Sequence, residues 1–307
     1  MKLNQVDHLV AVAEHGGLRP AARALDISAP ALAKSLKALE QEYGVPLLHR
    51  SVRGLQFTEY GRVVLGRARS IQSEMIRSHD EIAQMRGQKT GRVAVGVSPV
   101  SAALILPAAI DSLLRVYPDA SIKVVDTIFP SALERLSDGE LDFVVGPMPL
   151  SVASKAASAF DARALFYSKL GVLARAKHPL IHASSVSELD GASWVIIGSP
   201  TGPSSLMEGM FREAGFGVPH IAVMSDSLTA IQTLVRTTDL LALLPLELAS
   251  EGGPLEEGVR QIRLAAPSAS IRISLITRRD KPLTPAAQAL AAQVGRAARM
   301  LVQRQKN

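Results

Sequence analysis

The chain has 307 residues, of which 47% are hydrophobic and 20% are charged, so it is long enough for two or three globular domains and too apolar to be disordered. It contains no cysteine, which excludes disulfides, thiol chemistry and cysteine-zinc sites. The formal net charge is +6, and residues 1–90 hold 13 Lys and Arg against nine Asp and Glu. A polyanion would therefore bind the first third of the chain. The imbalance alone does not identify DNA as that polyanion.

A helix-turn-helix is predicted between Leu18 and Tyr43. It follows a first helix over residues 4–15, which ends at Gly16-Gly17. Two Ala- and Leu-rich helical segments then meet at the short break Asp26-Ile27, and this spacing is the signature of a helix-turn-helix. Ser28 is a good N-cap for the second helix, and Pro30 is tolerated in its first turn.

The second helix of this motif has two faces. Four residues at i, i+4, i+7 and i+11 share a stripe that we expect to be buried: Leu32, Leu36, Leu39 and Tyr43. The opposite face is small near its start and cationic further along, with Pro30, Ala33, Lys34 and Lys37. Such a face fits a major groove, with its first turn at base edges and its lysines near phosphates. An ordinary solvated helix face is the alternative.

A basic wing is predicted directly after this helix. Gly44 ends the helix, residues 45–48 begin a short apolar strand, and residues 55–57 return as a second strand. Arg50 and Arg53 lie near the loop between the strands, where they could contact phosphate or the minor groove. Arg50 could equally be the partner of a surface ion pair.

The first 60 residues resemble the winged helix-turn-helix of LysR-type transcriptional regulators. The resemblance rests on Ala21-Ala22, on the run Ile27–Leu32, on Gly44–Leu48 and on Thr58-Glu59 with Gly61. The chain departs from the family at two positions: the family usually has a Gln or similar polar residue where Ala29 stands, and often a Ser where Ala33 stands. An alanine can contact only a thymine methyl, so we expect direct base readout to be weaker or shifted. The resemblance implies a DNA-binding domain over residues 1–58 whose contacts come from Ser28, Ala29, Pro30, Ala33, Lys34, Lys37, Arg50 and Arg53.

A long linker helix is predicted from the Thr58 cap to about Arg86, within a linker and hinge over residues 59–90. Its apolar seam has a period of about 3.5 residues, which is typical of a coiled coil: Val64, Ala68, Ile71, Met75, Ser78, Ile82 and Met85. The stripe could instead dock on its own domain. We expect it to pair with a second copy, so that two recognition helices meet a near-palindromic duplex one or more turns apart, at ~34 Å per turn.

Strands and helices alternate over residues 91–307 and predict two α/β halves with a mainly parallel sheet. Strands are expected at 93–97, 122–125 and 141–146 in the first half, and at 171–174, 194–197, 221–224 and 241–244 in the second. A further strand at 271–277 can return to the first half, and Thr284-Pro285 begins a closing helix that ends near Arg304.

This half of the chain resembles the periplasmic-binding-protein-like effector domain of the same family. The marks are Leu106-Pro107, Tyr117-Pro118, Gly139–Asp142, His178–Leu180 and Thr284–Ala287. The resemblance implies a two-lobed, Rossmann-like α/β domain over 91–307, with lobe I at about 91–162 and 268–307 and lobe II at about 163–267. It also implies a small-molecule effector, a dimer through the linker helix that assembles into a homotetramer, and RNA polymerase as a further possible partner.

Ligands of open α/β sheets lie beyond the carboxyl ends of the strands. Hydroxyls and helix N-termini at those ends favour a small anion, such as a carboxylate or a sulfonate, although each serine could simply cap a helix. Ser98 leads, because Pro99 follows it and the family binds effectors there; Ser98-Pro99 with Asp142-Phe143 is similar to members that sense aromatic acids or sulfonates. The candidate effector-binding residues are Ser98, Pro99, Val100, Thr127, Phe129, Pro147, Ser199, Thr201, Gly202 and Ser227.

No catalytic, metal or cofactor motif is recognisable: the chain lacks G-x-S-x-G, H-E-x-x-H, P-loop and G-x-G-x-x-G patterns. We therefore expect a regulator and neither an enzyme nor a cofactor protein, with a solute-binding module that has no DNA role as the alternative. No apolar run approaches the ~20 residues of a membrane span, and residues 1–8 are too polar for a signal peptide. We expect a cytoplasmic protein that does not engage membranes.

Overall fold

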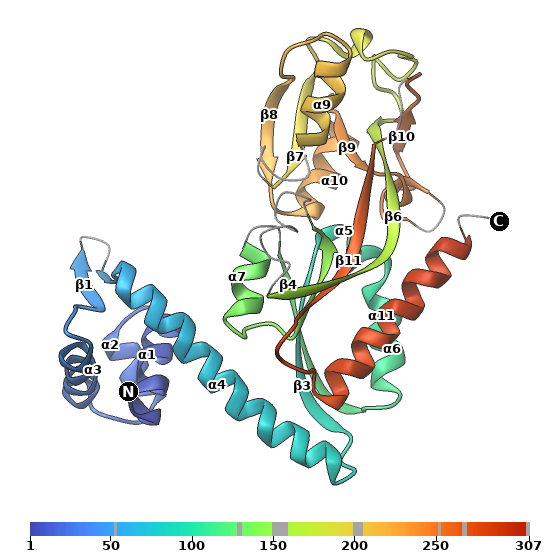
Figure 1. Ribbon diagram of the computed structural model, residues 1–307. Coiled ribbons are helices and arrows are strands. Elements are labelled where there is room, and N and C mark those ends of the chain that lie inside the picture. The colour runs from blue at the N-terminus through green and yellow to red at the C-terminus, as the bar shows by residue number, and fades with distance from the viewer. Residues whose placement is uncertain are drawn as a thin grey trace. The chain divides into compact units, whose positions relative to one another are not determined.

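A computed structural model describes residues 1–51, 54–127, 131–148, 159–198, 205–250, 253–265 and 269–304 (Figure 1). The chain divides into two compact units. Met1–Gln88 and Ser137–Leu141 form the first, and Lys89–Leu136 and Asp142–Asn307 form the second. The short segment Ser137–Leu141 thus groups with the N-terminal unit.

The first unit is a winged helix-turn-helix followed by a long helix, as the sequence predicts. Its elements are α1 (Leu3–His15), α2 (Leu18–Ala24), α3 (Ala29–Tyr43), β1 (Leu48–Ser51), β2 (Gly54–Phe57) and α4 (Glu59–Met85). Gly16 and Gly44 end α1 and α3 in the left-handed conformation that glycine adopts at little cost. The Thr58 hydroxyl caps α4 by accepting from the Gly61 N–H at 2.9 Å.

Two expectations about this unit are wrong. Tyr43 is 45% exposed although it continues the buried stripe of Leu32, Leu36 and Leu39, because it is the last residue of α3, where the helix extends past the domain core. The α4 seam is also divided: Val64 and Ala68 are buried in the core of their own domain, against α1 and its neighbours. Only the later part of the seam, with Met75, Ile82 and Met85, is exposed.

The second unit contains two lobes linked by long strands. Lobe I is built from β3 (Thr90–Val97), α5 (Pro99–Leu104), α6 (Leu106–Leu114), β4 (Asp119–Asp126), α7 (Ser131–Ser137), β5 (Phe143–Pro147) and α11 (Pro285–Arg304). Lobe II holds η1 (Ser187–Leu189), β7 (Ser193–Ile197), α9 (Ser205–Glu213), β8 (His220–Ser225), α10 (Leu228–Thr237), β9 (Ala242–Pro245), η2 (Leu246–Ala249) and β10 (Val259–Ile262). Strands β6 (Phe160–Arg175) and β11 (Ser270–Arg278) run between the lobes (Figure 1).

The main sheet is mixed, and not mainly parallel as the sequence suggested. Its strand order is β10-β6-β11-β5-β3-β4, with β9 also paired to β6. Pairs β3–β4 and β3–β5 are parallel, whereas β11 is antiparallel to both β5 and β6. The returning strand at 271–277 therefore does join the first half, and together with β6 it makes one sheet of both lobes. Strands β7 and β8 form a separate parallel pair.

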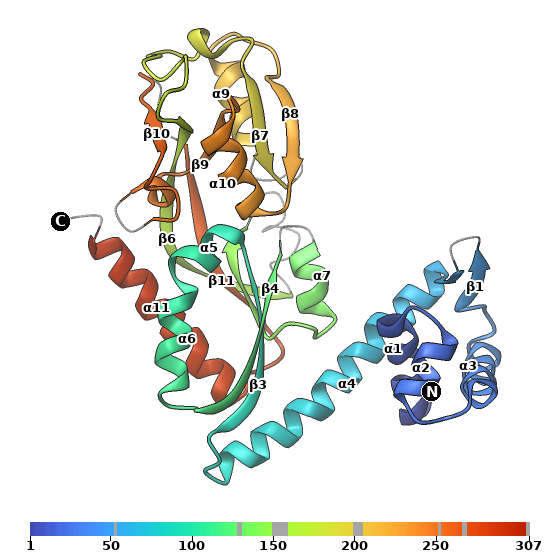
Figure 2. The same cartoon turned by 180° about the vertical axis from the view of Figure 1, so that it is seen from behind.

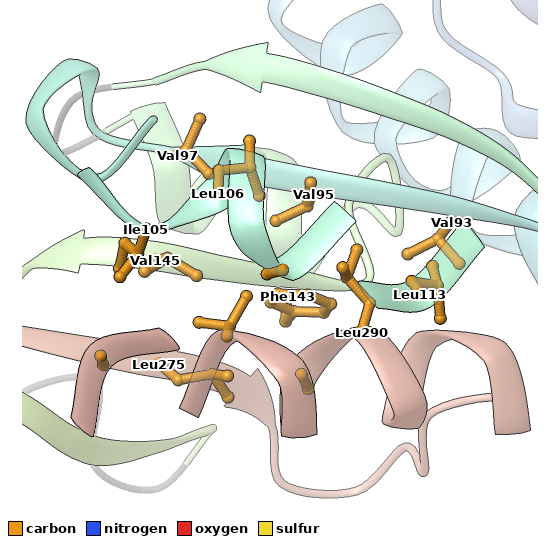
Figure 3. Packing of buried hydrophobic residues seen from close by; sticks show 14 of the residues in the cluster. Val93, Val95, Val97, Ile105, Leu106, Leu113, Phe143, Val145, Leu275 and Leu290 are labelled. Atoms are coloured by element: carbon orange, nitrogen blue, oxygen red, sulfur yellow. The ribbon is translucent and has the colours of Figure 1, made fainter. Parts of the chain in front are cut away.

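Apolar side chains from the sheet and two helices make the core of lobe I. Helices α6 and α11 lie on the same side of the sheet in both views (Figure 2). Phe143, Val95 and Leu290 meet in the middle of this layer, each 0% exposed (Figure 3). This packing fixes the carboxyl ends of β3 and β5, which border the cleft described below. No helix in the described ranges is long and apolar enough to cross a membrane.

Candidate functional site

The outer face of α3 carries the residues that sequence analysis assigned to DNA. Ser28 caps the helix by accepting from the Ala31 N–H at 3.2 Å. Lys34 and Lys37 are exposed and have no ion-pair partner among the described residues, and Pro30 is exposed near the start of the helix. Ala29 and Ala33 are half-buried. The face thus presents small side chains first and free cations one and two turns later.

The inner face of α3 fixes the position of the helix. Leu32, Leu36 and Leu39 are at most 4% exposed in the domain core. The carboxylate of Glu40 accepts hydrogen bonds from the Leu47 and Leu48 N–H groups at 2.8 and 3.0 Å, which ties α3 to the first wing strand. The wing itself is formed by the antiparallel pair β1–β2.

The arginines of the wing are described only in part. The main chain of Arg50 belongs to β1, where it pairs with Leu55. Arg53 lies outside the described residues. Their role in DNA binding therefore rests on the sequence pattern and on the position of the strands.

The partly buried His8 of α1, which contacts α3, is expected to make the stability of this unit sensitive to pH. The Nδ1 atom of His8 lies 2.7 Å from the Ser35 Oγ atom, and burial lowers the pKa of His8 despite the opposing effect of Asp7. As pH falls below 6.5, the ordinary pKa of histidine, the unfolded chain takes up the His8 proton before the folded chain does. The folded state therefore loses stability between pH 6.5 and the lower pKa of His8 in the folded chain. We expect the thermal midpoint of wild type to fall more between pH 7.5 and pH 5.5 than that of His8→Asn. Equal slopes in a calorimetric pH series would contradict this role.

The second unit brings the ends of three strands to one edge of its sheet. Val97 pairs with Asp126 in β4 and with Val145 in β5, so the residues that follow these strands lie side by side. The Thr127 N–H donates to the Val97 carbonyl at 2.9 Å, and the Ser98 N–H donates to the Val145 carbonyl at 2.8 Å. This edge is where ligands of open α/β sheets bind.

A cleft of about 670 Å³, including its open mouth, begins at this edge. It is lined by residues of both lobes and of the linking strands: Ser98, Pro99, Val100, Thr127, Val144, Gly146, Pro147, Leu170, Ile197, Leu243, Leu244, Pro245, Ile271 and Ile273. None of these side chains is charged, and only two of them are polar.

The two polar side chains, Ser98 and Thr127, form one end of the cleft. Ser98 Oγ accepts from the Ser101 N–H at 3.3 Å and lies 2.8 Å from Ser101 Oγ. Among the described residues, Ser98 is the single hydrogen-bond partner of the Ser101 hydroxyl. If the fully buried Ser101 hydroxyl donates to Ser98, both lone pairs of Ser98 are occupied and its own proton remains available. Thr127 Oγ1 is buried and has no hydrogen-bond partner among the described residues. This end of the cleft therefore suits a ligand atom that accepts hydrogen bonds.

Five of the ten candidate effector-binding residues line the cleft: Ser98, Pro99, Val100, Thr127 and Pro147. Phe129, Ser199, Thr201 and Gly202 lie outside the described residues. Ser227 is exposed, is not among the lining residues, and caps α10 by accepting from the Ala230 N–H at 3.3 Å. Its hydroxyl thus has the capping role that was the alternative for every serine at a strand end.

Sequence reasoning missed the apolar walls of the cleft. Leu170, Ile271 and Ile273 come from the linking strands, while Ile197 and the run Leu243–Pro245 come from lobe II. The predicted site followed strand ends that carry hydroxyls or begin helices, and it therefore did not include aliphatic residues within the linking strands or in β9. Pro245 was the signal in the sequence that could have indicated this wall, because it follows an apolar run and marks the end of strand β9.

Two family models match the chain. The model described as "Bacterial regulatory helix-turn-helix protein, lysR family" matches residues 3–62, and "LysR substrate binding domain" matches residues 86–299. The HTH-type transcriptional regulator GalR of Pseudomonas putida is 31% identical over 295 residues, which are 95% of this chain and 70% of that protein. An SDS degradation transcriptional activation protein of a Pseudomonas species is 28% identical over 94% of both chains.

Solved structures share this fold over almost the full length. The structure of full-length CbnR complexed with its target DNA has a TM-score of 0.67 and 22% identity, and the match covers 97% of this chain and 100% of that one. The similarity includes both the winged helix-turn-helix and the two-lobed unit.

Proposed function

The chain belongs to the LysR family of DNA-binding transcriptional regulators, and we propose that it is a one-component regulator in which a small organic acid in the cleft controls how α3 engages duplex DNA. The observation that carries this proposal is the presence, in one chain, of a helix with free cations on its outer face and of a cleft with a hydrogen-bonding end. The named relatives are regulators and not enzymes, and we expect no turnover from this chain.

The proposed DNA contacts divide into two kinds. Lys34 and Lys37 supply phosphate contacts, and Arg50 and Arg53 of the wing add phosphate or minor-groove contacts. Ser28, Ala29, Pro30 and Ala33 line the approach to the bases. Because Ala29 and Ala33 offer only methyl groups, sequence preference at those positions comes from thymine methyls or from DNA shape.

The proposed effector has an acceptor group at one end and an apolar body. Ser98 and Thr127 offer hydroxyl donors to a carboxylate or a sulfonate, and the walls around them are aliphatic. An aromatic acid satisfies both requirements, since a planar apolar ring fits between leucine and isoleucine side chains. The relative named for SDS degradation is consistent with this class, because SDS is an organic sulfate with an apolar tail.

We propose a dimer through the exposed part of α4, around Met75, Ile82 and Met85, and a tetramer built from two such dimers. Two recognition helices related by a two-fold axis favour a near-palindromic promoter site. RNA polymerase is then the partner through which bound protein changes transcription, and the cytoplasm is the compartment in which it meets DNA.

Replacing Thr127 with valine is expected to weaken effector binding without destabilising the free protein. The Thr127 hydroxyl is buried and has no partner within the described ranges, so its removal relieves a desolvation cost in the free protein. Loss of a hydrogen bond to a charged ligand costs about 1.5–3 kcal/mol, which weakens binding about ten- to a hundredfold. Calorimetric titration with the acid that gives the largest thermal shift measures the effect, and Thr127→Ser is the matched control that keeps the hydroxyl. Equal affinity in the valine variant would exclude a role for the hydroxyl.

The proposed function is tested by titrating full-length protein onto labelled duplexes from the flanks of its own gene and following fluorescence anisotropy. We expect binding whose logarithm falls linearly with the logarithm of salt concentration. A solute-binding module without a DNA role predicts ligand-induced thermal shifts together with no anisotropy change at any salt concentration. That pair of results would replace the regulator by the alternative.

A further inference from the structure

Helix α4 holds the segment Ser137–Leu141 through a set of side-chain contacts inside the first compact unit. Ser73 Oγ donates to the Gly139 carbonyl at 2.7 Å. Arg77 Nη2 lies 3.2 Å from the same carbonyl and 3.3 Å from the Leu141 carbonyl. These bonds satisfy backbone acceptors of a turn in which Gly139 has a φ of 76°. The segment therefore has fixed partners, although only its first residue, Ser137, belongs to a helix, as the last residue of α7.

Charge and packing strengthen this set of contacts. The Arg77 side chain is only 13% exposed, and its Nη1 atom donates to Glu74 at 2.7 Å, so the guanidinium is oriented by its own helix. Arg69 forms an ion pair with Glu140 at 2.8 Å, and both side chains are at most 30% exposed. A Cβ atom at Gly66 would lie 2.8 Å from Asp138 Oδ1, so the helix and the segment are in close contact there.

The held segment leads directly to the cleft. Leu141 is fully buried, and the next residue, Asp142, is bound to β3 by two hydrogen bonds of 2.7 Å with the main chain of Ala94. Strand β5 begins at Phe143, and its last residues, Gly146 and Pro147, line the cleft. Only four residues lie between Leu141, whose carbonyl is held by Arg77, and Gly146 of the cleft. Close-packed interiors have low compressibility, so buried and hydrogen-bonded main chain over such a short span is expected to move as a unit.

We propose that Arg77, supported by Ser73 and by the Arg69–Glu140 pair, is a positioning residue that couples α4 to the effector cleft through Ser137–Leu141 and β5. The inference rests on the proposed effector role of the cleft. A ligand that displaces the end of β5 then changes the contacts of α4, and by linkage a change in α4 alters ligand affinity by the same factor.

Hydrogen exchange on the free, full-length protein tests this coupling without DNA or effector. Arg77→Ala removes charge-assisted bonds to two carbonyls, so we expect exchange over residues 139–147 to accelerate about tenfold or more. Arg67→Ala is the matched control, because Arg67 is exposed on the same helix and makes no hydrogen bond or ion pair with this segment among the described residues. Exchange in β10, Val259–Ile262, should stay at the wild-type rate in both variants. Unchanged exchange over residues 139–147 in Arg77→Ala would overturn the proposal.

A charge swap distinguishes coupling from a general loss of stability, and it remains available if Arg77→Ala does not fold. Arg69→Glu and Glu140→Arg should each accelerate exchange over residues 139–147, and the double variant should restore protection. If the double variant did not recover protection over residues 139–147, the Arg69–Glu140 ion pair would have no part in the proposed coupling. Anisotropy with duplex DNA on the same wild-type preparation tests the proposed function separately, so a protein that binds no DNA but shows the expected exchange pattern would refute the regulator and retain the contact.

Discussion

The double variant Lys34→Ala/Lys37→Ala is expected to lose about a hundredfold in affinity for duplex DNA. Both amines are exposed on the outer face of α3 and have no ion-pair partner in the part of the chain that the structure describes. Each would make a charge-assisted contact of about 1.5 kcal/mol with a phosphate. Each lost phosphate contact also reduces the slope of log affinity against log salt by about 0.9, so the pair should flatten it by about 1.8. Anisotropy titrations at four or more salt concentrations measure both quantities.

The matched control is Lys177→Ala, which removes an exposed lysine from the second unit. It changes the net charge of the chain without touching α3. If the control lowers the slope as much as one of the α3 substitutions does, general electrostatic attraction would explain binding. An unchanged slope in the double variant would remove the two lysines from the interface.

Replacing Gly61 with alanine is expected to disrupt the winged domain. A Cβ atom there would lie 2.0 Å from the Leu47 carbonyl oxygen and 3.2 Å from a Phe57 ring carbon. That carbonyl belongs to the main chain and accepts a hydrogen bond from the Thr58 N–H at 2.9 Å, so it cannot rotate away as a side chain could. Overpacking typically costs 1–3 kcal/mol, and a main-chain clash falls at or above the upper end. We expect the unfolding midpoint of the first unit to fall by more than about 10 °C.

Gly209→Ala provides the control for this glycine substitution. Gly209 lies inside α9, and a Cβ atom there would meet nothing within 4 Å. Alanine in a helix interior is favoured over glycine by roughly 0.5–1 kcal/mol, so the control should be neutral or slightly more stable. The measurements are circular dichroism and calorimetry. An unfolding midpoint for Gly61→Ala equal to that of the wild type would show that α4 can move away from the wing without loss of stability.

Local signals predicted the first unit well. The break at Asp26-Ile27 and the caps Ser28 and Thr58 are short-range features, and each has its expected place in the structure. The same short range explains the errors. Tyr43 follows the apolar period of α3, yet nothing in that period tells where the domain core ends. The α4 stripe likewise could not reveal that Val64 and Ala68 pack on their own domain, because a heptad pattern does not name its partner.

In the second unit, the features that the sequence did not predict depend on pairing between strands that are far apart in the chain. Only residues 171–174 of β6 were expected as a strand, since the earlier part of β6 mixes Ala, Arg and Asp, which do not favour strands. Pairing with β11 along its length makes it one. For the same reason the polar end of the cleft, at Ser98 and Thr127, was predicted from strand ends, while the apolar walls from β9 and β11 were not.

DNase I footprinting of the region upstream of its own gene tests most directly whether α3 binds duplex DNA under the control of a ligand. Full-length protein should protect two blocks related by a near-palindrome and separated by one or more helical turns of ~34 Å. Addition of the organic acid that stabilises the protein in a thermal-shift screen should change the spacing or extent of protection. Protein that is folded and binds that acid, yet protects no part of the duplex at low salt, would contradict the account.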